Sequence, residues 1–200
     1  YTEKIYDNIQ TNWKIVNENF LEWYHVPTVH PSLAPNSTSE AHIVMDSNDK
    51  MIHFCTDPIT NNGSVIDLNG QLNINPYITD KLKQRLNFFY LYPNTIGFLH
   101  PTHMVLLYNY PINTNETYER LVFIQHPTNK LDNDTLEEHQ IKMDKIVNYW
   151  KVVNDEDIDI CQQQFKGVRS NGFKNGGYYS SNMEINCHRF HQMIIKSVTN

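Results

Sequence analysis

Two histidines flank a proline near the start of the chain, in the run His25-Val26-Pro27-Thr28-Val29-His30. Histidine is the commonest side-chain ligand of transition metals. On one ideal α-helix, two residues five positions apart point about 140° away from each other. Proline ends a helix because it lacks a backbone donor, so Pro27 allows His30 to turn back towards His25. The pair could bind one metal ion, although two structural histidines at a helix end would give the same sequence.

A cluster of acidic residues lies far along the chain, in the run Asp155-Glu156-Asp157-Ile158-Asp159. Acidic side chains are common in the first turn of a helix because they stabilise its dipole, which explains the cluster without any metal. Two histidines and one carboxylate, however, form the facial triad of non-haem Fe(II) oxygenases. Such a triad leaves three metal positions open for dioxygen, water and substrate. The histidine pair and one of these acidic residues are therefore a candidate iron site.

The elements that would position these residues follow from the pattern of apolar side chains. Residues 8–25 have apolar residues at roughly helical spacing and are predicted to form a helix that Pro27 ends. Residues 42–46 and 51–56 are predicted to form two strands. The stretch 57–80, which is rich in Asn, Gly, Pro and Thr, is predicted to be a long surface loop.

Short runs rich in aromatic and β-branched residues predict an antiparallel meander in the middle of the chain. The predicted strands are 87–92, 96–99, 103–110 and 120–125. Strands followed by helices predict an α+β fold. The absence of repeats and linkers predicts one domain over residues 1–200.

Three helices are predicted after the strands. Residues 133–153 form the first, with Asn133 or Asp134 as its N-cap, and residues 156–168 form the second. The third helix should begin near Ser180 or Ser181, because Ser181 and Glu184 have the spacing of a capping box.

The composition disfavours several classes of protein. A formal net charge of -6 and a pI near 5.9 disfavour a nucleic-acid partner, which usually needs a basic surface. No apolar run approaches 18 residues, so no membrane span is expected. Three scattered cysteines predict no disulfide scaffold and suit a reducing compartment such as the cytoplasm. The chain begins at Tyr1 rather than Met, and we expect a fragment of a longer protein.

A longer pattern surrounds the histidine pair: Asn12-Trp13-Lys14, then residues 18–25, then residues 27–31. This pattern resembles the signature of the catalytic domain in Rieske-type, ring-hydroxylating non-haem iron oxygenase α subunits. Within that family it is most similar to the branch of choline, carnitine and glycine-betaine oxygenases. Residues 156–170 resemble the family segment ED-x-x-x-C-x-x-x-Q-x-G-x-x-S, except that Gln164 lies one position before the family's glutamine. The strand at residues 89–94 and the closing Glu184, His188 and Phe190 fit as well, so the resemblance covers nearly the whole chain.

The resemblance implies roles for individual residues. His25 and His30 would ligate Fe(II), and Asp157 would be the carboxylate ligand because it follows Glu156 as in the family motif. Asp155 and Asp159 remain alternatives for that position.

Two further residues of the first helix have implied catalytic roles. Glu22 would match the family's acidic bridge, which relays electrons from a Rieske-cluster histidine of a neighbouring subunit; an exposed helical carboxylate is the alternative. Asn19 would be a hydrogen-bond partner close to the ligands.

The resemblance also implies a fold and partners. The fold would be a helix-grip, similar to START and Bet v1 proteins, in which an antiparallel sheet wraps around a long C-terminal helix. A Rieske 2Fe–2S cluster needs two cysteines and two histidines, and no such pairs exist in these 200 residues. The N-terminal Rieske domain is therefore expected outside this chain, together with an NAD(P)H-dependent reductase and a homotrimeric assembly.

Aromatic residues on the predicted strands are candidates for substrate contacts, as a cation–π cage or as an aromatic pocket wall. The candidates are Phe89, Tyr92, Phe98, Tyr108 and Tyr110; the alternative is that most of them are core residues. The expected activity is dioxygen-dependent hydroxylation of a quaternary amine or an aromatic compound, by mono- or dioxygenation. A metal-free domain that binds hydrophobic ligands is the alternative function, and a zinc hydrolase with the same three ligands is a third.

Overall fold

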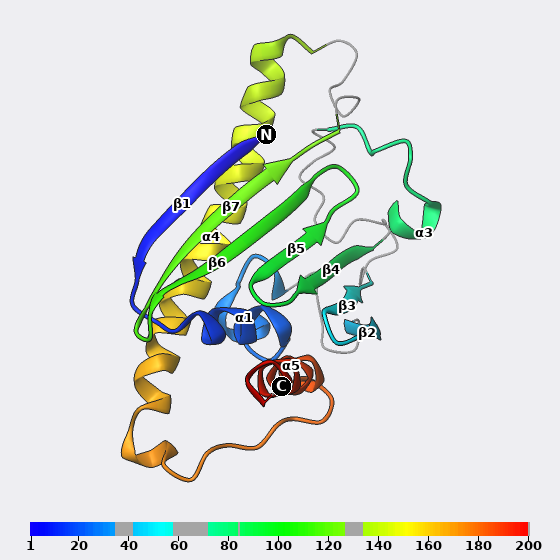
Figure 1. Cartoon of the computed structure of the whole chain (residues 1–200). Coiled ribbons are helices and arrows are strands. Elements are labelled where there is room, and N and C mark those ends of the chain that lie inside the picture. The colour runs from blue at the N-terminus through cyan, green and yellow to red at the C-terminus, as the bar shows by residue number, and fades with distance from the viewer. Residues whose placement is uncertain (35–41, 58–71, 84, 127–133, 200) are drawn as a thin grey trace.

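The computed structural model describes residues 1–34, 42–57, 72–83, 85–126 and 134–199. Within these residues, seven strands form one antiparallel sheet in the order β1-β7-β6-β5-β4-β3-β2 (Figure 1). The strands are β1 Thr2–Ile9, β2 His42–Ser47, β3 Met51–Thr56, β4 Leu86–Leu91, β5 Thr95–Leu99, β6 Met104–Asn113 and β7 Glu116–Ile124.

The described residues also form five α-helices. They are α1 Trp13–Leu21, α2 Val26–Val29, α3 Asp80–Lys83, α4 Leu136–Val168 and α5 Ile185–Thr199. Figure 1 shows α4 running along the part of the sheet formed by β1, β6 and β7, with α1 and α5 at one end. The antiparallel sheet packed on one long helix confirms the predicted α+β helix-grip fold; the long helix is α4, and the shorter α5 follows it.

The predicted strands are confirmed with shifts at their ends, and one strand was not predicted. The strand that was not predicted is β1, whose last two residues, Asn8 and Ile9, lie inside the helix predicted for residues 8–25. Its side chains alternate between half-buried and exposed, but Glu3, Lys4 and Asp7 hide the apolar alternation that marks a strand. Pairing with β7, which lies far along the chain, decides its conformation.

The helix predicted for residues 8–25 is shorter in the structure and contains neither histidine. α1 starts after Asn12, whose side chain accepts a hydrogen bond from the backbone of Lys14, and it stops at Leu21. Pro27 therefore does not break a helix but lies in the first turn of α2, where the missing N–H is not needed. His25 and His30 are the residues directly before and after α2.

The prediction of two helices at 133–153 and 156–168 is wrong, because α4 is one helix of 33 residues. Asn154 and Asp155 have low helix propensity, but the apolar face continues past them and packs on the sheet. The helix is capped by Thr135, which forms a capping box with Glu138, rather than by Asp134; Asn133 lies outside the described residues.

The predicted capping box of the last helix is also wrong. α5 begins at Ile185, and the Glu184 carboxylate accepts a hydrogen bond from the backbone N–H of Ser180 instead of Ser181. The predicted loop at 57–80 lies mostly in residues 58–71, outside the described residues; α3 begins at Asp80.

One hydrophobic core fills the space between the sheet and the helices. Side chains from β3 to β7 meet side chains from α1, α4 and α5, and Phe54, Tyr90, Phe123 and Phe190 are among the fully buried ones. Of the helices described, none combines the length and the hydrophobicity that a membrane crossing requires. The core holds α1, α2 and α4 in fixed positions, and these three helices supply the candidate site.

Candidate metal centre

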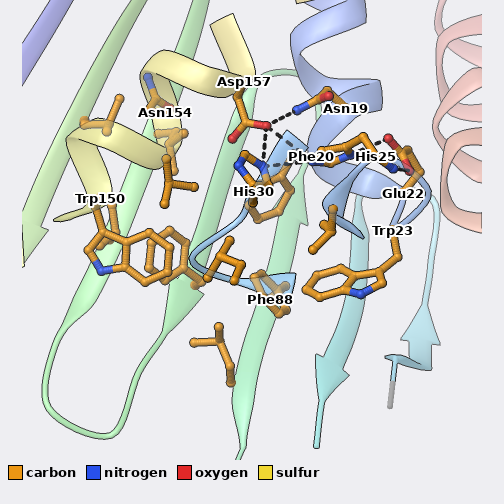
Figure 2. Close-up of a pocket in the computed structure, with 18 residues that line it drawn as sticks. Asn19, Phe20, Glu22, Trp23, His25, His30, Phe88, Trp150, Asn154 and Asp157 are labelled. Atoms are coloured by element: carbon orange, nitrogen blue, oxygen red, sulfur yellow. Dashed lines mark hydrogen bonds and ion pairs between the residues drawn. The ribbon is translucent and has the colours of Figure 1, made fainter. Parts of the chain in front are cut away.

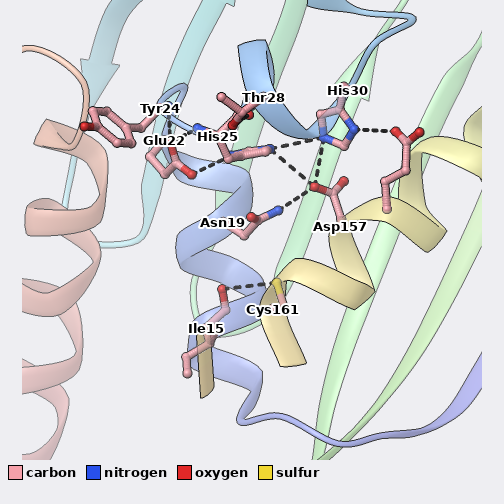
Figure 3. Close-up of polar contacts among 10 residues, drawn as sticks. Ile15, Asn19, Glu22, Tyr24, His25, Thr28, His30, Asp157 and Cys161 are labelled. Carbon is pink, nitrogen blue, oxygen red and sulfur yellow. Dashed lines mark hydrogen bonds and ion pairs between the residues drawn. The ribbon is translucent and has the colours of Figure 1, made fainter. Parts of the chain in front are cut away.

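Three side chains from two separate parts of the chain converge at one point (Figure 3). His25 and His30 approach from the two ends of α2, and Asp157 approaches from α4. The Nε2 atoms of the two histidines are 3.2 Å apart. The Oδ1 atom of Asp157 lies 3.3 Å from His25 Nε2 and 3.0 Å from His30 Nε2. Among the described residues, this is the one group of three potential ligands that is close enough to hold a metal ion.

Each imidazole ring has a carboxylate partner at Nδ1, the ring nitrogen that faces away from the candidate metal position. His25 Nδ1 donates to Glu22 Oε1 at 2.5 Å, and His30 Nδ1 donates to Glu156 Oε2 at 2.7 Å. Because each Nδ1 is committed to a carboxylate, each Nε2 is directed at Asp157. Carboxylate partners of this kind are typical of metal-bound histidines, whose orientation and basicity they set.

The Asp157 carboxylate also has a fixed orientation. Asn19 of α1 donates a hydrogen bond from Nδ2 to Asp157 Oδ1 at 2.6 Å. Asn19 therefore contacts the carboxylate and not a histidine ring. This bond connects α1 to α4 at the level of the site.

The site has a strongly negative environment that favours a cation. Burial acts to lower the pKa of His25, but the carboxylates of Asp157 and Glu22 outweigh it and raise that pKa to about 9. His30 has a raised pKa for the same reason, with Asp157 and Glu156 as its partners. Burial acts to raise the pKa of Asp157, yet the two histidines lower it to about 2. The field that attracts protons to these imidazoles would equally attract a divalent ion.

The distances between the three donor atoms fit a metal ion. Divalent first-row metals bind imidazole nitrogen and carboxylate oxygen at about 2.0–2.2 Å, so neighbouring ligands at right angles lie about 2.8–3.1 Å apart. The three distances here are 3.0, 3.2 and 3.3 Å. Small side-chain movements would bring the three atoms onto one face of an octahedron. The residues present therefore fit an Fe(II) ion.

The two rival acidic residues point elsewhere. Asp155 pairs with Lys151 on the surface of α4, and Asp159 accepts a hydrogen bond from Gln163 at 2.7 Å. Neighbouring positions two residues apart on a helix point in nearly opposite directions. The geometry therefore favours Asp157 over both.

The donor atoms border a pocket whose other walls are mostly hydrocarbon (Figure 2). Its cavity volume is about 80 Å³. Aliphatic side chains from β4, β6, β7 and α4 form part of the wall, and aromatic rings form much of the rest. The aromatic lining residues are Phe20, Trp23, Phe88, Phe98 and Trp150. No lysine or arginine is found among the lining residues that the structure describes.

Of the five predicted substrate-contact residues, only Phe98 lines this pocket. Phe89 lies on the opposite face of the sheet, where its ring covers Gly97, because side chains alternate along a strand. Tyr108 and Tyr110 stack on that same outer face, and the Tyr92 hydroxyl contacts Ser197 of α5. The structure thus assigns these four residues to packing and surface contacts.

Sequence reasoning missed three residues near the site. Phe88 faces the pocket, one position before the predicted Phe89. The strand pattern shows that neighbouring side chains alternate between the two faces of the sheet, but it does not say which face is turned to the helices. Trp150 lies seven residues before Asp157, which is two helical turns, so it shares a face with that residue. The prediction of two separate helices hid this spacing, because a shared face can be assigned only along one continuous helix. Glu156 was noted only as part of a motif, and its contact with His30 depends on the fold.

A family model described as ring hydroxylating alpha subunit (catalytic domain) matches residues 1–200. The chain belongs to this family. A ring-hydroxylating alpha subunit is also what the sequence pattern resembles, so the resemblance is confirmed.

Similar proteins agree with this assignment. The carnitine monooxygenase oxygenase subunit of Acinetobacter pittii (strain PHEA-2) is 23% identical over 168 residues, which are 83% of this chain and 40% of the relative. The corresponding Acinetobacter baumannii protein is 22% identical over the same shares. The chain therefore spans well under half the length of these relatives.

Solved structures show the same fold. The quaternary ammonium Rieske monooxygenase CntA in complex with L-carnitine has a TM-score of 0.65 at 16% identity, covering 100% of this chain and 49% of that one. Pseudomonas putida CBB5 NdmB has a TM-score of 0.55 at 12% identity, covering 99% of this chain and 52% of that one. These likenesses establish the helix-grip architecture for this ring-hydroxylating alpha subunit domain.

Proposed function

We propose that this domain binds one Fe(II) ion through His25, His30 and Asp157 and hydroxylates a small organic substrate in the adjacent pocket. One observation carries the proposal: two imidazole nitrogens and one carboxylate oxygen converge within 3.3 Å of one another in a chain of the ring-hydroxylating family. A bound Fe(II) ion would supply the activation of dioxygen. The side chains of this domain would hold the ion, orient the substrate and exclude water.

The chemistry of the pocket wall supports a substrate with an apolar surface. Aromatic faces can hold either a quaternary ammonium group, through cation–π contacts, or an aromatic ring. Apart from the metal centre itself, a buried carboxylate would find no cationic partner, because the lining residues that the structure describes include no lysine or arginine. We therefore propose that the buried part of the substrate is a quaternary amine or an aromatic group. The named activity of the Acinetobacter relatives is compatible with the first of these.

Electrons would enter through Glu22. Its carboxylate accepts hydrogen bonds from His25 Nδ1 and from the backbone N–H groups of Tyr24 and His25. A carboxylate offers about four acceptor positions, so one position remains for an outside donor. Glu22 also borders an open, more polar pocket with Tyr24, Tyr179 and His191. We propose that a histidine of a Rieske 2Fe–2S centre, supplied by a neighbouring subunit of a homotrimer and reduced by an NAD(P)H-dependent reductase, approaches here.

Anaerobic titration of this domain with Fe(II) tests the metal site. We expect one iron per chain in the wild type and loss of tight binding in His30→Ala, because the triad would lose a ligand. His188→Ala is the matched control, since this histidine is exposed on α5 and should leave the stoichiometry unchanged. Equal iron binding by both variants would refute the ligand assignment.

A single-turnover reaction with hydrogen peroxide tests the chemistry without a Rieske centre. The iron-loaded domain is mixed with labelled peroxide and with choline, glycine betaine, L-carnitine or an aromatic acid, and products are analysed by mass spectrometry. We expect a hydroxylated product that contains oxygen from peroxide and is missing in His30→Ala. Ligand binding that is indifferent to chelators, with no product, would instead support a metal-free binding domain. Hydrolysis of a substrate without any oxidant would support the zinc hydrolase.

A further inference from the structure

We propose that His103 is a positioning residue that holds Trp150 as the end wall of the pocket and thereby restricts the pocket to small substrate groups. The inference rests on the proposed function in one respect, since it takes this pocket as the substrate site. It concerns residues that lie away from the metal centre.

Trp150 closes the pocket on the side opposite the metal ligands. Figure 2 shows its indole across the pocket from Asp157, His30 and His25, with the ring nitrogen directed away from Phe88. Trp150 is only 6% exposed, and its ring packs on Phe98 with 4.3 Å between centroids. One broad face of the pocket therefore consists of this side chain.

The indole nitrogen makes a buried hydrogen bond to a histidine. Trp150 Nε1 donates to His103 Nε2 at 2.9 Å, and His103 is 3% exposed. An indole N–H can only donate. His103 Nε2 must therefore be unprotonated, and the single proton of the neutral ring must be on Nδ1.

The other nitrogen of His103 belongs to a longer chain of hydrogen bonds. His103 Nδ1 donates to Thr102 Oγ1 at 3.0 Å. The Thr102 hydroxyl also lies 2.9 Å from His100 Nδ1, which accepts a hydrogen bond from the Thr102 backbone N–H as well. The His103 ring is thus held at both nitrogens, by Trp150 at Nε2 and by Thr102 at Nδ1, and this keeps an acceptor facing Trp150.

The surroundings of His103 keep it neutral. The rings of His100 and His103 stack with 4.7 Å between centroids. Burial lowers the pKa of His103 well below its usual value, and His100 lowers it further. A protonated ring could not accept from Trp150, so a neutral ring keeps the wall in place.

The size of the cavity indicates what this wall excludes. The cavity volume is about 80 Å³, whereas an apolar cavity of about 150 Å³ holds benzene. The buried part of the substrate is therefore small, comparable to a methylated amine or a branched alkyl group. If the indole could swing away, the space that it fills would be added to the pocket and two-ring compounds would fit.

Binding of a graded set of neutral probes to the metal-free domain tests this proposal. Calorimetry gives the affinities for 3,3-dimethylbutan-1-ol, benzene and naphthalene, and the NMR shift of the Trp150 indole N–H reports its hydrogen bond. His103→Phe keeps a ring but has no acceptor, whereas His103→Gln retains an acceptor at a similar position. We expect His103→Phe to shift the indole signal and to raise naphthalene affinity relative to benzene by about tenfold. His103→Gln should restore values near the wild type.

Further outcomes separate this proposal from loss of folding and from the proposed function. Trp150→Leu removes the indole directly and should also favour naphthalene, so the proposal stays testable if His103→Phe does not fold. An unchanged probe ratio in Trp150→Leu, or equal effects of the Phe and Gln substitutions at His103, would overturn it. Iron stoichiometry is measured on the same proteins. Failure of the wild type to bind iron would refute the proposed function and leave the probe ratios as evidence about the wall.

Discussion

The contact between Glu156 and His30 leads to a prediction about metal affinity. Glu156 Oε2 accepts the Nδ1 proton of His30 at 2.7 Å, and the His30 side chain is 2% exposed. Glu156→Ala would remove the acceptor and leave a buried N–H without a partner. The ring would then be free to rotate, and Nε2 would become a weaker ligand.

The size of the effect follows from the kind of bond and its exposure. Hydrogen bonds to charged groups contribute about 1.5–3 kcal/mol. The Glu156 side chain is 30% exposed, and solvent weakens the interaction, so the lower part of that range applies. A loss of about 1.5–2 kcal/mol corresponds to about 10–30-fold weaker metal binding, in line with the effects of removing such partners in metal proteins.

An anaerobic competition titration with Fe(II) and a coloured chelator measures this change. Asp155→Ala is the control, because Asp155 precedes Glu156 on α4 but pairs with Lys151 at the surface. We expect Asp155→Ala to bind iron like the wild type. If Glu156→Ala also bound iron as tightly as the wild type, the contact with His30 would have no role in orienting the ligand.

Three further predictions follow from the structure. Asp157→Ala should empty the metal site, measured as iron per chain, while Asp159→Ala should not. The reverse result would make Asp159 the carboxylate ligand. Burial raises the pKa of Glu119 to about 7, with the Asn154 hydrogen bond opposing this and Asp157 adding to it, so the folded state binds more protons than the unfolded state between about pH 4.5 and 7. As the pH rises from about 4.5 to 7, the free energy of unfolding of the metal-free domain should therefore fall by up to about 3 kcal/mol. Urea unfolding of Glu119→Gln should lack this fall. The same pH dependence in wild type and variant would contradict the raised pKa. Phe190→Ala should lower the free energy of unfolding by about 3–5 kcal/mol, because this fully buried ring anchors α5. A decrease below about 1 kcal/mol in the same urea assay would show that the Phe190 ring does not anchor α5.

The candidate ligands could be predicted because their signal is local. His25 and His30 lie close together in a distinctive aromatic frame, and Asp157 lies in a recognisable acidic segment. The strands of the meander were predictable for the same reason, since their aromatic and β-branched residues form short separate runs. The choice of Asp157 over Asp155 and Asp159 came from the resemblance to the family motif, since the acidic run alone does not distinguish them.

The pocket wall could not be predicted, because it depends on contacts between distant segments. Phe88 and Phe89 are equivalent in the strand pattern, and only packing against the helices decides that Phe88 faces inward. Likewise β1 contains too many charged residues to be recognised as a strand before its pairing with β7 is known. The low helix propensity of Asn154 and Asp155 suggested a break in α4 that tertiary packing overrides.

The continuity of α4 fixes one dimension of the candidate substrate pocket. Trp150 and Asp157 lie on one rigid helix, and seven residues at 1.5 Å per residue separate their backbone positions by about 10.5 Å along the axis. The distance from the end wall to the metal ligand is therefore set by helix geometry and not by a loop. Inserting one residue between them would turn Trp150 by about 100° away from the pocket. We expect related domains to change substrate length by replacing the side chain at the position of Trp150 and to keep the number of residues between it and the carboxylate.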